Sequence, residues 1–203
     1  MNKTVQEFRR ESIKQLLVKI LQTKILRLEP QSALVEESFN SDFTAVNLTI
    51  SKREFDSKSQ IQLEEQNGKG FVDGIFKSCS KFFLEDYPSL ENIILKDYRV
   101  SPSFKKIKSK QQTDAEVQVT VAMEVKERGT AEFTSTSRSI LHSTLVATLE
   151  AFEFYINCEK TFHEIQTILT DAHNRNRGDI VQSCVSDLSK LTEVNTYDKK
   201  EKN

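Results

Sequence analysis

The segment from residue 117 to 125 constrains the fold more than any other part of this chain. Apolar side chains occupy every second position: Val117, Val119, Val121, Met123 and Val125. Because successive side chains of a strand point to opposite faces, this alternation predicts a long β-strand with one buried and one solvated face. Such strands are typical of antiparallel sheets covered on one side, so we expect an antiparallel sheet packed against helices.

A first unit of strands followed by a helix is predicted upstream. Alternating apolar positions at 46–50 and 61–63 flank a charged turn at 53–58, which indicates a hairpin with one buried face. The chain breaks at the glycine-bearing segment 67–70. Apolar residues then recur every three or four positions over 72–83, which predicts a helix.

A second unit repeats this order. It has a predicted strand at 93–100, a lysine-rich connection through Pro102, the strand at 117–125 and a turn at Gly129. A helix is predicted over 140–156 by the same three-to-four spacing. Two tandem units of strands and then a helix suggest an internal pseudo-repeat.

Helical extensions are predicted on both sides of these units. The stripe over 4–28 predicts an amphipathic helix that ends before Pro30, and its apolar face is expected to pack on its own domain or on a dimer mate. Two further helices are predicted at 160–173 and 179–191, with a break at 174–178. The apolar stripe of the first helix consists of Ile13, Leu16, Leu17, Ile20, Leu21, Ile25 and Leu28.

The expected organisation is an α+β domain with helical appendages. Residues 1–30 form the arm, 31–157 the α+β domain and 158–194 the C-terminal helices. Residues 195–203 contain almost no apolar side chain and are expected to be a disordered tail.

Composition argues against several classes of partner. The 203 residues include 29 basic and 30 acidic ones, which are interspersed, so no single-signed field favours nucleic acid. No apolar run approaches the roughly 20 residues needed to cross a bilayer, and the N-terminus does not resemble a signal peptide. The three cysteines are widely spaced and fit reduced thiols. We therefore expect a soluble cytoplasmic protein without nucleic-acid or membrane partners.

Catalytic and metal-binding motifs are not recognisable. The three histidines are scattered, and the zincin-like start at His163-Glu164 fails because Thr167 stands where the second histidine belongs. Nothing resembles a nucleophile elbow. We therefore expect neither a metal, nor a cofactor, nor a catalytic residue.

The turn Gly68-Lys69-Gly70 has two interpretations. It does not match a dinucleotide fingerprint or a P-loop. Its backbone N–H groups, at the start of a helix, suit the binding of a carboxylate. Alternatively, it is simply a tight turn from strand to helix.

Four segments together resemble the regulatory domain of 2-isopropylmalate synthases and citramalate synthases. Residues 67–77 (NGKGFVDGIFK) are similar to G-x-G-P-V-D-A, and residues 95–100 (LKDYRV) to L-x-D-Y-x-V. Residues 113–119 (TDAEVQV) are similar to G-x-D-A-x-V-x-V, and residues 137–144 (SRSILHST) to S-x-D-I-I-x-A-S. The segments occur in the family's order, within about 43–157.

The resemblance implies two strand-strand-strand-helix units related by a pseudo-twofold axis and paired in a homodimer. It implies a small branched-chain amino acid, leucine or isoleucine, held between the units. The catalytic barrel and metal site of the synthases have no counterpart here, so the chain is expected not to be an enzyme. A separate synthase subunit is an expected partner.

The matched positions supply a hypothetical ligand site. The N–H groups around Gly68 and Gly70 would hold the carboxylate, and Asp97 or Asp114 the ammonium group. The remaining candidates are the apolar residues Leu95 and Tyr98, and Phe71 and Ala115 from the motifs. The alternative for Leu95 and Tyr98 is ordinary core packing, and for the two aspartates a turn or cap role.

Departures from the family pattern bear on this site. Phe71 replaces the motif's proline and is bulky enough to plug the slot, Gly74 replaces alanine, and Phe133 and Ser135 replace glycines. Three hypotheses follow: an amino-acid sensor acting on a synthase, an interaction module that has lost the ligand, and a free-standing enzyme. A site filled by side chains would favour the interaction module.

Overall fold

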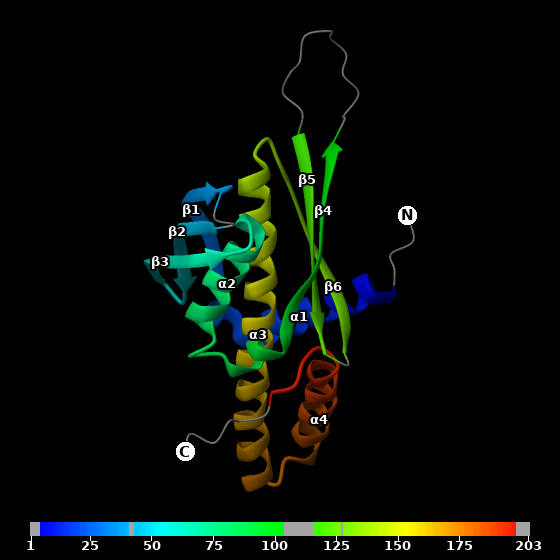
Figure 1. Cartoon of the computed structure of the whole chain (residues 1–203). Helices are drawn as coiled ribbons and strands as arrows, with labels where there is room; N and C mark the ends of the chain where they lie inside the picture. Colours follow the sequence, from blue (N-terminus) through cyan, green and yellow to red (C-terminus); the bar gives the residue numbers. More distant parts are fainter. Residues whose placement is uncertain (1–4, 41–42, 104–115, 127, 198–203) are drawn as a thin grey trace.

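The computed structural model describes residues 5–40, 43–103, 116–126 and 128–197 (Figure 1). Their strands form two three-stranded antiparallel sheets, ordered β1-β2-β3 and β4-β5-β6, which confirms the expected α+β class with terminal helices. In chain order the elements are α1 (Val5–Leu21), the 3-10 turn η1 (Gln22–Lys24), β1 (Arg27–Ser38), β2 (Phe43–Glu54), β3 (Ser57–Gly68), α2 (Phe71–Phe83), the 3-10 turn η2 (Pro88–Asn92), β4 (Ile93–Ser103), β5 (Glu116–Val125), β6 (Gly129–Ser137), α3 (Ile140–Asn174) and α4 (Gly178–Thr192).

The two units share the strand order and one irregularity of register, although β2 has a further bulge at Thr44/Val46 that the β5–β6 pair lacks. A bulge interrupts the first strand pair of each unit near its start, at Pro30/Ser32 in β1 and at Leu95/Asp97 in β4. Ile50 and Met123 are the partners of Pro30 and Leu95 at these bulges, and both are buried in the middle strands. This shared irregularity supports the internal pseudo-repeat, because a bulge at one position of a ladder is a specific feature.

Strand β1 was not predicted from periodicity, and the helix predicted over 4–28 is too long. Helix α1 ends at Leu21, where Gln22 takes a positive φ of 51°, and β1 starts at Arg27. Pro30 is compatible with β1 because this is an edge strand and the residue adjoins the bulge. Leu28 is buried as expected, but from extended chain rather than from a helix, and Leu26 is buried in place of the expected Ile25, which is half-buried.

Helices α2 and α3 lie between the two sheets (Figure 1). Helix α2 packs on β2 and β3 of its own unit, whereas α3 packs on β5 and β6 and also on β1 of the other unit. The alternating residues of the middle strands face these helices and form one continuous core. The fully buried ones are Val46, Leu48, Ile50, Val119, Val121 and Met123.

The amphipathic arm packs on its own chain. Helix α1 lies against α3 and buries Ile13, Leu16 and Leu17, while Lys14 Nζ lies 3.0 Å from Glu150 Oε1 on α3. The apolar face of α1 is therefore covered within the protomer. Of the two expected partners for this face, its own domain or a dimer mate, the structure shows the first, so α1 gives no argument for a homodimer.

Helix α3 runs without interruption for 35 residues, across the boundary expected at 157/158. Neither proline nor glycine occurs between Ile140 and Asn174, so nothing in the sequence ends the helix there. Its first half lies between the sheets and its second half extends beyond them to pair with α4 (Figure 1). The break expected at 174–178 is where α3 turns into α4.

The tail expected to be disordered begins with three ordered residues. Asn195 is fully buried and its Nδ2 donates to the Ser89 carbonyl at 2.9 Å. The ring of Tyr197 stacks on Phe162 of α3 with centroids 4.7 Å apart. The prediction was wrong for 195–197, because one aromatic ring and one amide suffice to anchor them; residues 198–203 lie outside the described part of the chain.

Asn157 fastens the start of β1 to α3. Its side chain accepts a hydrogen bond from Leu26 N–H at 2.9 Å and donates one to Leu26 C=O at 3.0 Å. Replacing Asn157 by Leu leaves both buried backbone groups unpaired, so we expect a loss of about 2–4 kcal/mol in the free energy of unfolding, measured by urea titration. Asn174→Leu, at the exposed end of the same helix, is the control; equal stability of the two variants would contradict this role.

Candidate functional site

The starts of α2 and α3 meet β4 at a region that we call the seam, defined by Gly70, Phe71, Tyr98 and Thr144. The ring of Phe71, from the first unit, lies edge-on to the ring of Tyr98, from the second, with centroids 6.2 Å apart. The Tyr98 hydroxyl is 2.8 Å from Thr144 Oγ1 on α3. The seam is thus where the resemblance places the amino acid, and here it contains an aromatic pair.

Glycines allow α2 to approach the first sheet closely. A Cβ at Gly68 would lie 2.9 Å from Gly74 Cα, and a Cβ at Gly74 would lie 2.6 Å from Val46 Cγ2. Gly70 has a φ of 82°, in the left-handed region that favours glycine. The turn interpretation therefore explains Gly68 and Gly74 by steric fit and Gly70 by its backbone conformation.

In the second unit, serines stand at the positions equivalent to these glycines. Gly68 pairs with Thr44 and precedes α2 by three residues, just as Ser137 pairs with Val117 and precedes α3 by three. The Gly68–Gly74 contact corresponds to the hydrogen bond between Ser137 and Ser143, whose Oγ atoms are 2.7 Å apart. Ser139 caps α3 by accepting from His142 N–H at 3.2 Å, whereas Gly70 has no side chain with which to cap α2.

The N–H groups expected to hold a carboxylate have partners within the protein. Lys69 N–H donates to Asp73 Oδ2 at 2.8 Å, and Gly70 N–H donates to Thr44 Oγ1 at 3.1 Å. Asp73 thus occupies the position of an anion at the start of α2. Its burial would raise its pKa, but the hydrogen bond from Lys69 and the nearby Lys77 outweigh burial and hold the pKa below its ordinary value.

The other candidate residues do not complete a site at the seam. Leu95 is half-buried and packs against the core. Asp97 is exposed, accepts from Tyr98 N–H at 2.9 Å and pairs with Arg99 at 3.2 Å. It precedes Tyr98 directly in β4, so the two side chains point to opposite faces of the sheet. Asp114 and Ala115 lie outside the described residues.

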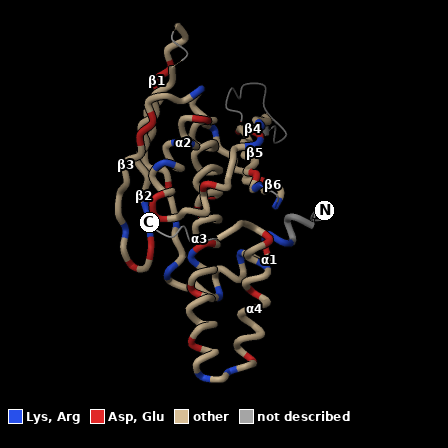
Figure 2. Tube along the Cα trace, turned by 60° about the horizontal axis from the view of Figure 1, so that its bottom comes forward, with Lys and Arg blue, Asp and Glu red and all other residues tan. Residues whose placement is uncertain are grey.

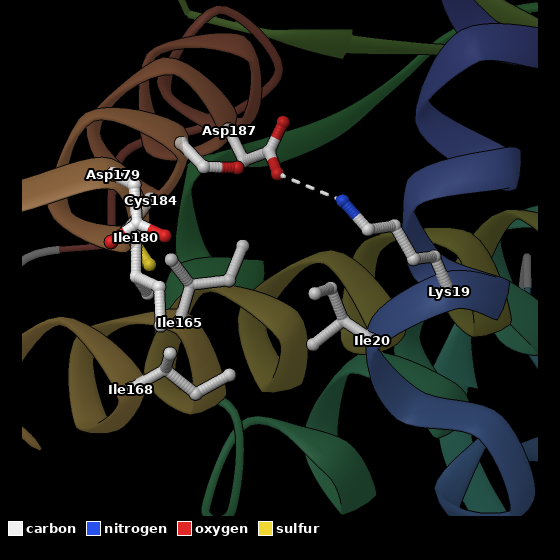
Figure 3. Close-up of a pocket in the computed structure, with 9 residues that line it drawn as sticks. Lys19, Ile20, Ile165, Ile168, Asp179, Ile180, Cys184 and Asp187 are labelled. Atoms are coloured by element: carbon white, nitrogen blue, oxygen red, sulfur yellow. Dashed lines mark ion pairs between the residues drawn. The ribbon is translucent and has the colours of Figure 1, made fainter. Parts of the chain in front are cut away.

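A groove between α1, α3 and α4 is the feature that sequence reasoning missed (Figure 3). We call it the helical groove; its volume is about 290 Å³. Charged side chains from two helices border it, and Lys19 Nζ on α1 faces Asp187 Oδ2 on α4 at 3.7 Å (Figure 3). Its lining consists of Lys19, Ile20, Ile165, Ile168, Asp179, Ile180, Ser183, Cys184 and Asp187.

The cysteines are free and buried. Burial raises the pKa of the Cys79 thiol to about 12 and also raises the pKa values of Cys158 and Cys184. The thiolate form that nucleophilic chemistry requires is therefore disfavoured at neutral pH. Within the described ranges, His, Cys, Asp and Glu side chains form no group of three that could hold a metal ion.

The Asp73 carboxylate gives the start of α2 a pH-dependent stability. Because its pKa is lowered from 3.8, its contribution is present above that value and is lost as pH falls through the folded-state pKa. We expect Asp73→Asn to lower the free energy of unfolding by about 1 kcal/mol at pH 7, and the difference from the parent protein to shrink in acid. Denaturant titrations between pH 7 and pH 2.5 measure this, with exposed Asp86→Asn as the control; a difference independent of pH would contradict it.

Comparison with known proteins identifies no family for this chain. No family model matches it, and no curated protein is significantly similar to it. The regulatory-domain resemblance therefore depends on the four segments, and the functional argument depends on the geometry of the seam and of the helical groove.

Proposed function

We propose that this protein is a non-catalytic regulatory module that binds a small branched-chain amino acid and acts on a separate enzyme subunit. The observation that carries the proposal is the repeat around the seam. Both units have the same strand order, the same bulge and a helix that starts three residues after equivalent strand positions. This architecture agrees with the one that the resemblance implies.

The positions of the matched segments add support. Residues 67–77 form the turn and start of α2, residues 95–100 belong to β4, and residues 137–144 form the start of α3. These three segments, far apart in sequence, meet through the contacts of Phe71, Tyr98 and Thr144. Segments that matched only by chance would have no reason to meet at one place.

A second candidate is an interaction module that has kept the fold and lost the ligand. The packed seam favours it specifically. Phe71 stands where the family has proline and its ring packs on Tyr98, while the N–H groups of Lys69 and Gly70 are already paired. An amino acid could enter the seam only after Phe71 moved and these hydrogen bonds opened.

The proposal includes a cytoplasmic protein that does not bind nucleic acid. Across the described ranges, no helix combines the length and apolar character needed to span a membrane. Basic and acidic residues are mixed along both sheets and along α3 and α4 (Figure 2), so neither sign dominates the fold.

A homodimer also remains part of the proposal. In the described ranges, β3 and β6 are edge strands with one unpaired side, which is a surface that a second copy can extend. We expect light scattering at micromolar concentration to give twice the monomer mass of 23.3 kDa. A monomer mass would contradict this part of the proposal without bearing on ligand binding.

Ligand binding is tested by thermal unfolding with leucine and with isoleucine. A ligand at 100 times its dissociation constant stabilises the folded state by about 2.7 kcal/mol, which raises Tm by several degrees in a chain of this size. We expect such a shift for the parent protein, with D-leucine as the control for nonspecific effects.

The variant Phe71→Pro restores the residue typical of the family and tests the seam. Tighter leucine binding by this variant is expected if the phenyl ring obstructs a seam site. If neither the parent protein nor the variant responds to millimolar leucine or isoleucine, the sensor proposal fails and the interaction module replaces it.

A further inference from the structure

We infer that the helical groove between α1, α3 and α4 is a binding site for a small aliphatic zwitterion, such as an α-amino acid with a branched side chain. The inference rests on the proposed function, because that function makes amino-acid binding relevant to this protein. It differs in location, because the groove is formed by the terminal helices and not by the seam. The choice of ligand class follows from what lines the groove.

The walls of the groove are aliphatic. Isoleucines come from all three helices: Ile20 from α1, Ile165 and Ile168 from α3, and Ile180 from α4 (Figure 3). Ile165 is fully buried, whereas Ile168 is 36% exposed at the open side. A volume of about 290 Å³ lies just below the usual range for ligand sites, so it suits only a compact aliphatic group.

Opposite charges face each other at the edge of these walls. Lys19 Nζ and Asp187 Oδ2 are 3.7 Å apart, which is an ion pair but is longer than a hydrogen bond (Figure 3). The Asp187 side chain is 11% exposed and is also held by Lys190 at 2.7 Å, so its carboxylate is fixed. The Lys19 side chain is 66% exposed and therefore free to move.

A zwitterion complements this arrangement. Its ammonium group would bind the Asp187 carboxylate and its carboxylate would bind the Lys19 ammonium, replacing one long ion pair by two charge-assisted hydrogen bonds. Its aliphatic side chain would lie against the isoleucines. A simple amine or a simple acid would satisfy only one member of the Lys19–Asp187 pair.

Binding in the groove would also affect how the terminal helices pack. Its charged edge links α1 to α4, and its floor is the second half of α3, whose first half lies between the two sheets. A ligand that bridges Lys19 and Asp187 would hold α1 against α4. The ligand would thus stabilise the packing of both terminal helices on α3.

The first experiment fills the groove from its exposed side. Ser183 on α4 is exposed and lines the groove, whereas Ser186, one turn further along, is exposed but does not line it. In isothermal titration of the full chain with leucine and isoleucine, we expect Ser183→Phe to raise Kd at least about tenfold and Ser186→Phe to leave it unchanged. Both substitutions replace an exposed serine, so neither removes a core contact.

The second experiment tests the charges. We expect Lys19→Gln to weaken leucine binding by about tenfold, while Arg9→Gln, which removes a more exposed charge from the same helix, has no effect. Leucine should also bind more tightly than 3-methylbutylamine or 4-methylpentanoate, which keep the aliphatic chain but lack the carboxylate or the ammonium group. Equal affinity for either analogue would overturn the assignment to a zwitterion.

Cys184 gives an independent readout at the groove itself. It lines the groove and is 7% exposed, whereas Cys79 and Cys158 are fully buried. Leucine is expected to slow the alkylation of Cys184 by iodoacetamide, followed by peptide mass spectrometry, in the parent protein but not in Ser183→Phe. Alkylation at an unchanged rate under saturating leucine would overturn the inference.

The outcomes separate this inference from the proposed function. If leucine binds and the groove variants leave its Kd unchanged, the groove assignment fails while the sensor proposal stands, and a response to Phe71→Pro would then place the site at the seam. If no branched-chain amino acid binds and Cys184 is not protected, both fail.

Discussion

The packing of α3 against both sheets is the interaction on which the rest of the structure depends. Within its own unit, α3 covers β5 and β6, where Phe133 packs against Phe154 and Tyr155. In the other unit it reaches the start of β1. Asn157 pairs with both backbone groups of Leu26, just before the strand, and Glu153 accepts from Leu28 N–H within it. These polar side chains act like an additional strand at the edge of β1. A buried edge would otherwise leave backbone groups unpaired, which is costly.

The seam shows how two similar units can diverge at equivalent positions. Glycines at 68 and 74 bring α2 against its sheet, while serines at 137 and 143 meet through a hydrogen bond in the second unit. In the first unit Gly70 has no capping side chain. Instead, Asp73 and Thr44 accept hydrogen bonds from the N–H groups of Lys69 and Gly70. The Phe71 ring lies edge-on to Tyr98 of the other unit. The N–H groups that the motif offers to a carboxylate are thus paired within the protein.

The terminal helices lie outside the resemblance, but they have a structural role. Helix α1 covers α3 with Ile13, Leu16 and Leu17, and residues 195–197 fold back onto η2 and α3. Helix α1, the second half of α3 and α4 line the helical groove, which combines isoleucines with an ion pair. Here the space left by helix packing, rather than any motif, provides a surface with the chemistry of a ligand site.

The sequence by itself determined the elements whose side chains alternate or recur on one face. Local periodicity predicts the strand at 117–125 and the helix over 72–83, because burial of one face imposes that period. The turn at 67–70 follows from its glycines. Only the tertiary structure decided where β1 starts, because apolar residues such as Leu26 and Leu28 fit a helix and a strand equally well. The contact between Leu26 and Asn157, which holds the start of β1, spans 131 residues. It alone paired Phe71 with Tyr98, set Asp97 on the opposite face of β4, and brought Lys19 to Asp187. Such contacts depend on how elements distant in sequence pack, and local periodicity carries no record of that packing.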